Sequence, residues 1–149
     1  MLNLAVLLED SARNVPDRTA VICGDTHFTY AEITAKANQV AHALKKFGIE
    51  KGDKVALSCP NLPFFPIIYY GILKAGAVVV PHNILFKARE VEYHLTDSDA
   101  RLHFCFEGTL ELPMGIEGLK GFEAAETCAA KFKKLALTVG YLEPNGGGQ

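Results

Sequence analysis

The feature that most constrains the fold is an uncharged stretch from Val55 to Leu73 that prolines interrupt. Its length suits a membrane-spanning helix, but Pro60, Pro63 and Pro66 lie inside it and would break such a helix. The same residues suit a buried strand that ends at Pro60, followed by a helix that begins at Pro63 or Pro66, because proline is tolerated in a first helical turn. We therefore interpret the stretch as protein interior and expect no transmembrane segment.

Strands and helices alternate around this stretch. The boundaries that we expect are a turn at Gly52-Asp53, a helix end by Gly76, a second buried strand over Ala77–Val80 closed by Pro81, a helix through Ala88, Val91 and Leu95, and a strand over 102–106. Such an order predicts parallel strands joined by right-handed helical crossovers. The predicted fold class is α/β, with a mainly parallel sheet flanked by helices.

The first part of the chain predicts a short helix and a hairpin. Leu4, Leu8, Ala12 and Val15 share one helical face, and Pro16 ends that helix. Two β-prone runs, Ala20–Cys23 and His27–Thr29, flank Gly24-Asp25, which has the composition of a tight turn. We expect a β-hairpin there.

A capping box marks the start of a long helix. In Thr29-Tyr30-Ala31-Glu32 the threonine hydroxyl can accept from the helix amides, while the glutamate accepts from the amide of Thr29. Apolar residues then recur at the helical period, and Gly48 stands where a left-handed cap would end the helix.

Composition excludes several classes of function. The net charge is −2 and the basic residues are scattered, so we expect no nucleic-acid partner. The four cysteines, Cys23, Cys59, Cys105 and Cys128, are far apart and predict neither a metal site nor disulfides, which fits a reducing compartment. Because the N-terminus has no basic leader, we expect a cytoplasmic protein.

Polar residues follow two of the predicted strands. Asn61 comes after the first, and His82 and Asn83 come after the second. Ligands bind beyond the carboxyl ends of parallel strands, so Asn61 or Asn83 could hydrogen-bond a ligand and His82 could move a proton. The alternative is scaffold, in which asparagine caps the next helix and proline stops the strand. The sequence favours the scaffold role for Asn61.

The strand over 102–106 alternates apolar residues with Arg101, His103 and Cys105, which predicts one less buried face and a surface or edge position for His103. Beyond it, a helical stripe runs from Ala124 to Leu135, and the end of the chain has the composition of a flexible tail. We expect one domain over 1–128 and a divergent helix and tail over 129–149.

Four blocks together resemble a known family. They are FTYAEI (28–33), GIEKGDKVALSCPNLPFF (48–65), GILKAGAVVVPHN (71–83) and REVEYHLTDSDAR (89–101). They are similar to the N-terminal region of adenylate-forming acyl-CoA synthetases, and most of all to bacterial long-chain fatty-acid CoA ligases. In this comparison Thr29, Glu32, Gly52, Asp53, Pro60, Asn61, Gly76 and Pro81 are structural positions, and His82 stands where the family more often has an apolar residue.

The resemblance implies an enzyme that uses ATP and magnesium to convert a fatty acid to an acyl-adenylate and then transfers the acyl group to coenzyme A. The family's phosphate-binding loop, ribose-binding aspartate and catalytic lysine have no counterpart in these residues. No catalytic, cofactor-binding or metal-binding residue is therefore assigned to this chain. We expect it to bind no cofactor by itself and to be inactive alone.

Two other interpretations stay open. The chain could be a stand-alone module that binds a fatty acyl group or a partner protein, and its exposed sheet edge and apolar face predict self-association. It could also be an unrelated small α/β enzyme that uses His82 and Asn83.

Overall fold

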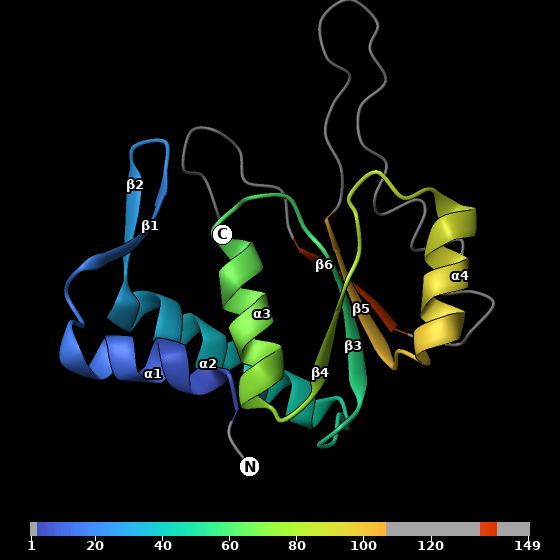
Figure 1. Ribbon diagram of the computed structural model, residues 1–149, viewed down its shortest axis with the longest axis horizontal. Coiled ribbons are helices and arrows are strands. Elements are labelled where there is room, and N and C mark those ends of the chain that lie inside the picture. The colour runs from blue at the N-terminus through green and yellow to red at the C-terminus, as the bar shows by residue number, and fades with distance from the viewer. Residues whose placement is uncertain (1–2, 107–134, 140–149) are drawn as a thin grey trace, which may run out of the picture. The chain divides into compact units, whose positions relative to one another are not determined.

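Figure 1 shows the computed structural model, which describes residues 3–106 and 135–139. In chain order the elements are α1 (Ala5–Asn14), β1 (Thr19–Cys23), β2 (Thr26–Thr29), α2 (Tyr30–Lys46), β3 (Lys54–Ser58), α3 (Phe64–Lys74), β4 (Val78–Pro81), α4 (Ala88–Ser98), β5 (Leu102–Phe106) and β6 (Leu135–Val139). The chain divides into two compact units. Unit 1 is Met1–Val55 with Asn61–Val80, and unit 2 is Ala56–Pro60 with Pro81–Gln149.

Unit 1 contains the hairpin and three helices that contact one another (Figure 1). Strands β1 and β2 pair antiparallel, with Cys23 opposite Thr26 around the turn, so the predicted hairpin is confirmed. The core of this unit is built by Leu8, Ile33, Ala37 and Ile67, with half-buried apolar side chains packed around them. Burial of these side chains is what holds α1, α2 and α3 together.

Helix α2 has the predicted capping box. The Thr29 hydroxyl oxygen accepts from the Glu32 amide at 3.2 Å, and a Glu32 carboxylate oxygen accepts from the Thr29 amide at 2.8 Å. At the other end Gly48 has a φ of 76°, a left-handed conformation that glycine adopts without strain. Both predicted ends of the helix are confirmed.

Helices α2 and α3 lie close together at Gly71, which is buried on α3. A β-carbon at Gly71 would lie 2.5 Å from the Val40 Cβ and 3.0 Å from the Ala37 carbonyl oxygen. None of the residues of α3 falls in the exposed class, as its apolar sequence predicts. The close contact therefore depends on the absence of a side chain at this position.

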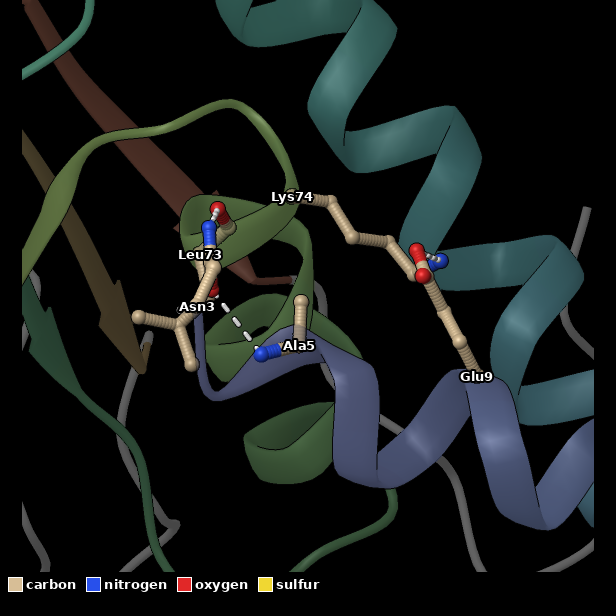
Figure 2. A network of polar contacts seen from close by, with 5 residues as sticks. All are labelled: Asn3, Ala5, Glu9, Leu73 and Lys74. Atoms are coloured by element: carbon tan, nitrogen blue, oxygen red, sulfur yellow. Dashed lines mark hydrogen bonds and ion pairs between the residues drawn. The ribbon is translucent and has the colours of Figure 1, made fainter. Parts of the chain in front are cut away.

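A small polar network ties α1 to the end of α3 (Figure 2). Asn3 donates from Nδ2 to the Leu73 carbonyl at 2.7 Å and accepts from the Ala5 amide at 2.9 Å. The Lys74 ammonium lies 2.7 Å from a Glu9 carboxylate oxygen, and the Lys74 side chain is only 8% exposed. The charge of a nearly buried lysine is thus balanced by one partly exposed carboxylate.

The predicted parallel sheet has the strand order β4-β3-β5-β6. Strand β4 runs parallel to β3, because the Val78 amide donates to the Asp53 carbonyl and the His82 amide to the Leu57 carbonyl, both at 2.8 Å. Strands β5 and β6 are also parallel, with Leu102 opposite Leu135. The α/β class and the mainly parallel sheet are confirmed.

Four details differ from the predictions. Leu4 is 56% exposed, because the buried face of α1 runs through Ala5 and Leu8 instead. Strand β4 is not fully buried: it is outermost in the strand order, and Val78 is 47% exposed. Residues 135–139 form strand β6, where the sequence suggested the end of a helix and a tail. The rest of the predicted helix and tail lies outside the described residues.

The fourth difference concerns β5. All of its residues are buried, and His103 is 3% exposed, so the predicted surface position of His103 is wrong. The alternation along this strand is between large apolar side chains and His103 or Cys105. Because free cysteine and neutral histidine both tolerate burial, this alternation does not separate a core face from a solvent face.

Candidate functional site

The two predicted strand ends differ in their surroundings. Asn61 follows β3 and is exposed, and α3 begins after Pro63 with no side-chain hydrogen bond at its N-cap, so the predicted capping role of Asn61 is wrong. Asn83 is also exposed. Its side-chain oxygen accepts from the Leu85 amide at 2.9 Å and its carbonyl from the Phe86 amide at 3.1 Å. Asn83 therefore shapes the turn before α4, which is a scaffold role.

His82 occupies a different environment from its neighbour Asn83. Its amide continues the β4 ladder by donating to Leu57, which fixes the backbone and directs the side chain inward. The residue is only 8% exposed. A histidine that the sequence placed at the end of a strand is thus buried in unit 2.

Two further histidines surround His82. Its ring centroid lies 5.1 Å from that of His103 on β5 and 5.5 Å from that of His94 on α4. His94 in turn stacks on Phe86, with centroids 4.7 Å apart and ring planes 6° apart. We call His82, His94 and His103 the histidine cluster. It joins the end of β4, the middle of α4 and the interior of β5.

The rings of His82 and His103 have no hydrogen-bond partner among the described residues, and this holds for both nitrogens of each ring. A buried polar atom without a partner typically costs about 1–3 kcal/mol. Most buried polar groups in proteins are satisfied, so an arrangement with four such atoms needs an explanation.

Burial also controls the charge of the cluster. It lowers the pKa of His82 to about 4, with charge repulsion from His94 as the smaller cause. It lowers the pKa of His103 to about 3, with repulsion from His82 adding to the effect. Both rings are therefore neutral at physiological pH, and each offers one N–H donor and one nitrogen lone pair.

The sequence analysis found His82 but missed the cluster. The signal was present, because three of the five histidines lie between positions 82 and 103. Their spacing alone could not reveal it, since His94 and His103 come from different elements that meet only in the fold. The other two histidines, His27 and His42, are exposed.

Other candidate chemistry is limited in the described part of the chain. No group of three or more histidine, cysteine, aspartate or glutamate side chains there has an arrangement that could hold a metal ion. Burial raises the pKa of Cys59 to about 11, which keeps it a protonated, unreactive thiol. Cys23 and Cys59 are free, and Cys128 lies outside the described residues.

Among the helices that the structure describes, none combines the length and the apolar character that a membrane span requires.

Comparison with known proteins shows what the chain resembles. Residues 8–143 match the family of AMP-binding enzymes. Over 98 residues the chain is 45% identical to a medium/long-chain-fatty-acid and 3-oxocholest-4-en-26-oate CoA ligase of Mycobacterium marinum. This alignment covers 66% of this chain and 18% of the relative. Over 95 residues it is 41% identical to a long-chain-fatty-acid CoA ligase of Bacillus subtilis, covering 64% of this chain and 17% of the relative. The chain thus spans less than a fifth of either relative.

Solved structures that are similar to the chain also include CoA ligases. The N-terminal domain of FACL13 from Mycobacterium tuberculosis is 39% identical, with a TM-score of 0.66 over 70% of this chain and 27% of that one. The anthranilate CoA ligase AuaEII, solved with anthranoyl-AMP, is 27% identical, with a TM-score of 0.80 over 95% of this chain and 26% of that one.

Proposed function

The chain belongs to the family of AMP-binding enzymes, and we propose that it forms the N-terminal part of an ATP-dependent CoA ligase for long-chain fatty acids. The observation that carries this proposal is the 45% and 41% identity to two fatty-acid CoA ligases from different bacteria. The resemblance inferred from the four sequence blocks points to the same substrate class. A cytoplasmic location fits this metabolic role and is part of the proposal.

In the proposed ligase, a fatty-acid carboxylate oxygen attacks the α-phosphorus of ATP and pyrophosphate leaves. The thiol of coenzyme A then attacks the acyl carbon and AMP leaves. Magnesium supplies charge neutralisation at the phosphates, for which it prefers oxygen ligands.

The described residues fit a scaffold. Strand β3 is buried from Val55 to Ser58, and of the residues that follow β4 His82 enters the core and Asn83 serves a turn. We therefore propose that the ATP and CoA chemistry depends on parts of the ligase that this chain does not supply, and that the 149-residue chain is inactive alone.

Pyrophosphate release tests this proposal. The purified chain is incubated with palmitate, ATP and magnesium, with a heat-denatured sample and the complete Bacillus subtilis relative as negative and positive references. We expect release at the level of the denatured sample. Release above that level that is abolished by omitting palmitate would contradict the proposed inactivity.

A second candidate function is a stand-alone fatty-acyl-binding or protein-interaction module. The exposed Val78 on the outermost strand of the described sheet favours self-association through that edge, because unpaired strand edges template further pairing. Light scattering across a wide concentration range tests it, with Val78→Lys as the variant that should dissociate the oligomer. A monomer at every concentration would rule out self-association. Saturable binding of a fluorescent fatty acid would support the module.

A further inference from the structure

The histidine cluster is a part of the core that the scaffold role does not explain. His82 and His103 are more than nine-tenths buried, and none of their ring nitrogens has a partner among the described residues. A scaffold would be more stable with apolar residues at these positions, because each unpartnered buried polar atom is destabilising. A feature that costs stability in this way calls for a functional explanation.

All three histidines of the cluster belong to unit 2. His82 follows β4, His94 lies on α4 and His103 lies on β5, and these positions all fall within Pro81–Gln149. The histidines of unit 1, His27 and His42, are exposed, so a positive charge on either ring stays in contact with water. Protonation of histidine therefore requires burial of a charge in unit 2 and not in unit 1.

The three rings also hinder one another's protonation. The ring centroid of His82 lies 5.1 Å from that of His103 and 5.5 Å from that of His94. A charge on His94 repels a charge on His82, and a charge on His82 repels one on His103. Burial and repulsion act in the same direction, and both lower the pKa of His82 and of His103. The folded unit therefore resists protons that an opened unit would accept.

The charged side chains of the elements around the cluster lie at the surface. Residues 56–60 and strand β6 contribute none. The Glu90 carboxylate accepts from the Lys87 amide at 2.9 Å and so belongs to the start of α4. The charged residues between positions 81 and 106 are exposed, apart from the half-buried Glu92; they are Lys87, Arg89, Glu90, Glu92, Asp97, Asp99 and Arg101.

We propose that the histidine cluster is an acid-sensitive switch, in which protonation of His82 and His103 opens unit 2 while unit 1 stays folded. In the opened unit both rings contact water, and their charges are no longer held close together. Compact units of a protein can open separately, and histidine clusters in pH-sensing proteins act in this way. The switch rests on the cluster and does not depend on the proposed ligase function.

The size of the response follows from the difference in pKa between the closed and the opened unit. In the opened unit each ring has its ordinary pKa near 6.5, whereas in the closed unit both pKa values lie below 5. Lowering the pH from 7 to 5 therefore shifts the equilibrium toward the opened unit by about twentyfold for each ring and by several hundredfold for both. Carboxylates with an ordinary pKa near 4 stay mostly ionised at pH 5, so the histidines dominate the response in this range.

Hydrogen exchange of the complete chain tests the switch. Exchange is followed by mass spectrometry at pH 7 and pH 5, with exchange times corrected for the effect of pH on the intrinsic rate. We expect the protection of α4 and β5 in unit 2 to fall by roughly two orders of magnitude or more relative to that of α2 in unit 1. The protection should return when the pH is restored to 7.

Two variants identify the groups that respond to acid. The double variant His82→Leu/His103→Leu should keep α4 and β5 protected at pH 5, whereas His42→Leu, at an exposed position, should behave as the wild type. The comparison of the two units within the wild-type chain does not require either variant to fold. The proposal is overturned if both units of the wild type lose protection by the same factor, or if the loss persists after return to pH 7. It is also overturned if the double variant loses as much protection as the wild type.

Discussion

Val40 occupies the space that a side chain on Gly71 would need: its Cβ lies 2.5 Å from the position of a β-carbon on Gly71. Gly71→Ala should therefore destabilise the chain by about 1–3 kcal/mol, the usual cost of overpacking a core. The intrinsic helix preference acts the other way and favours alanine by about 1 kcal/mol. A lower free energy of unfolding for Gly71→Ala would mean that overpacking outweighs the helix preference of alanine, and a higher one would mean the reverse.

Urea denaturation measures this free energy. Lys36→Ala, at an exposed position of α2, serves as the control and should change the free energy of unfolding by less than about 0.5 kcal/mol. A Gly71→Ala variant as stable as the wild type would show that α2 and α3 do not approach as closely as described.

The capping box gives a second prediction. Thr29→Ala removes the oxygen that accepts from the Glu32 amide, so the free energy of unfolding should fall by about 1 kcal/mol. Thr29→Ser retains the oxygen and should restore most of that stability. Equal stability of the alanine and serine variants would argue against a stabilising cap.

The ion pair between Glu9 and Lys74 gives a third prediction. Glu9→Ala leaves a nearly buried lysine without its carboxylate and should destabilise the chain, whereas the double variant Glu9→Ala/Lys74→Met should recover stability because no unpaired charge remains. The exposed pair of Asp10 and Arg13, at 3.1 Å, is the comparison, and Asp10→Ala should have little effect. Thermal melts of the three variants and the wild type distinguish these outcomes.

The histidine cluster predicts a pH dependence. In the unfolded chain each histidine has its ordinary pKa near 6.5, while in the folded chain the pKa of His82 is about 4 and that of His103 about 3. At a pH between the folded and the unfolded pKa values, the unfolded chain therefore binds more protons than the folded chain. The free energy of unfolding falls as the pH drops from 6.5 toward 3. Because one pKa unit corresponds to about 1.4 kcal/mol, the two shifts together correspond to a loss on the order of 8 kcal/mol.

Carboxylates also titrate in this range, so the comparison with His82→Leu/His103→Leu isolates the contribution of the two rings. The double variant should lose less stability between pH 6.5 and pH 4 than the wild type in urea denaturation, and His42→Leu should behave as the wild type. Parallel curves for the wild type and the double variant would mean that the two histidines are not buried and neutral.

Elements with local signals were predictable from the sequence. The hairpin, both ends of α2 and the boundaries of β3 follow from turn glycines, a capping box and a run of apolar residues, all of which act within a few residues. The α/β class followed from the alternation of such elements. The four sequence blocks also identified the family.

Features that depend on distant contacts were not predictable. Strand β6 exists because residues 135–139 pair with β5, and no local pattern marks that pairing. The burial of His103 depends on what covers both faces of β5, while the alternation of residue types suggested one open face. The cluster of His82, His94 and His103 requires three elements to meet, and no spacing along the chain encodes that.

The two compact units interleave along the chain, because the polypeptide passes from one to the other after Val55, after Pro60 and again after Val80. No single proteolytic cut can therefore release either unit whole. A cut after Val80 leaves residues 56–60 on the N-terminal fragment, whereas the rest of unit 2 is on the C-terminal fragment. Expression of unit 2 by itself therefore requires a redesigned connection that joins residues 56–60, from β3 and the turn after it, to the rest of the unit.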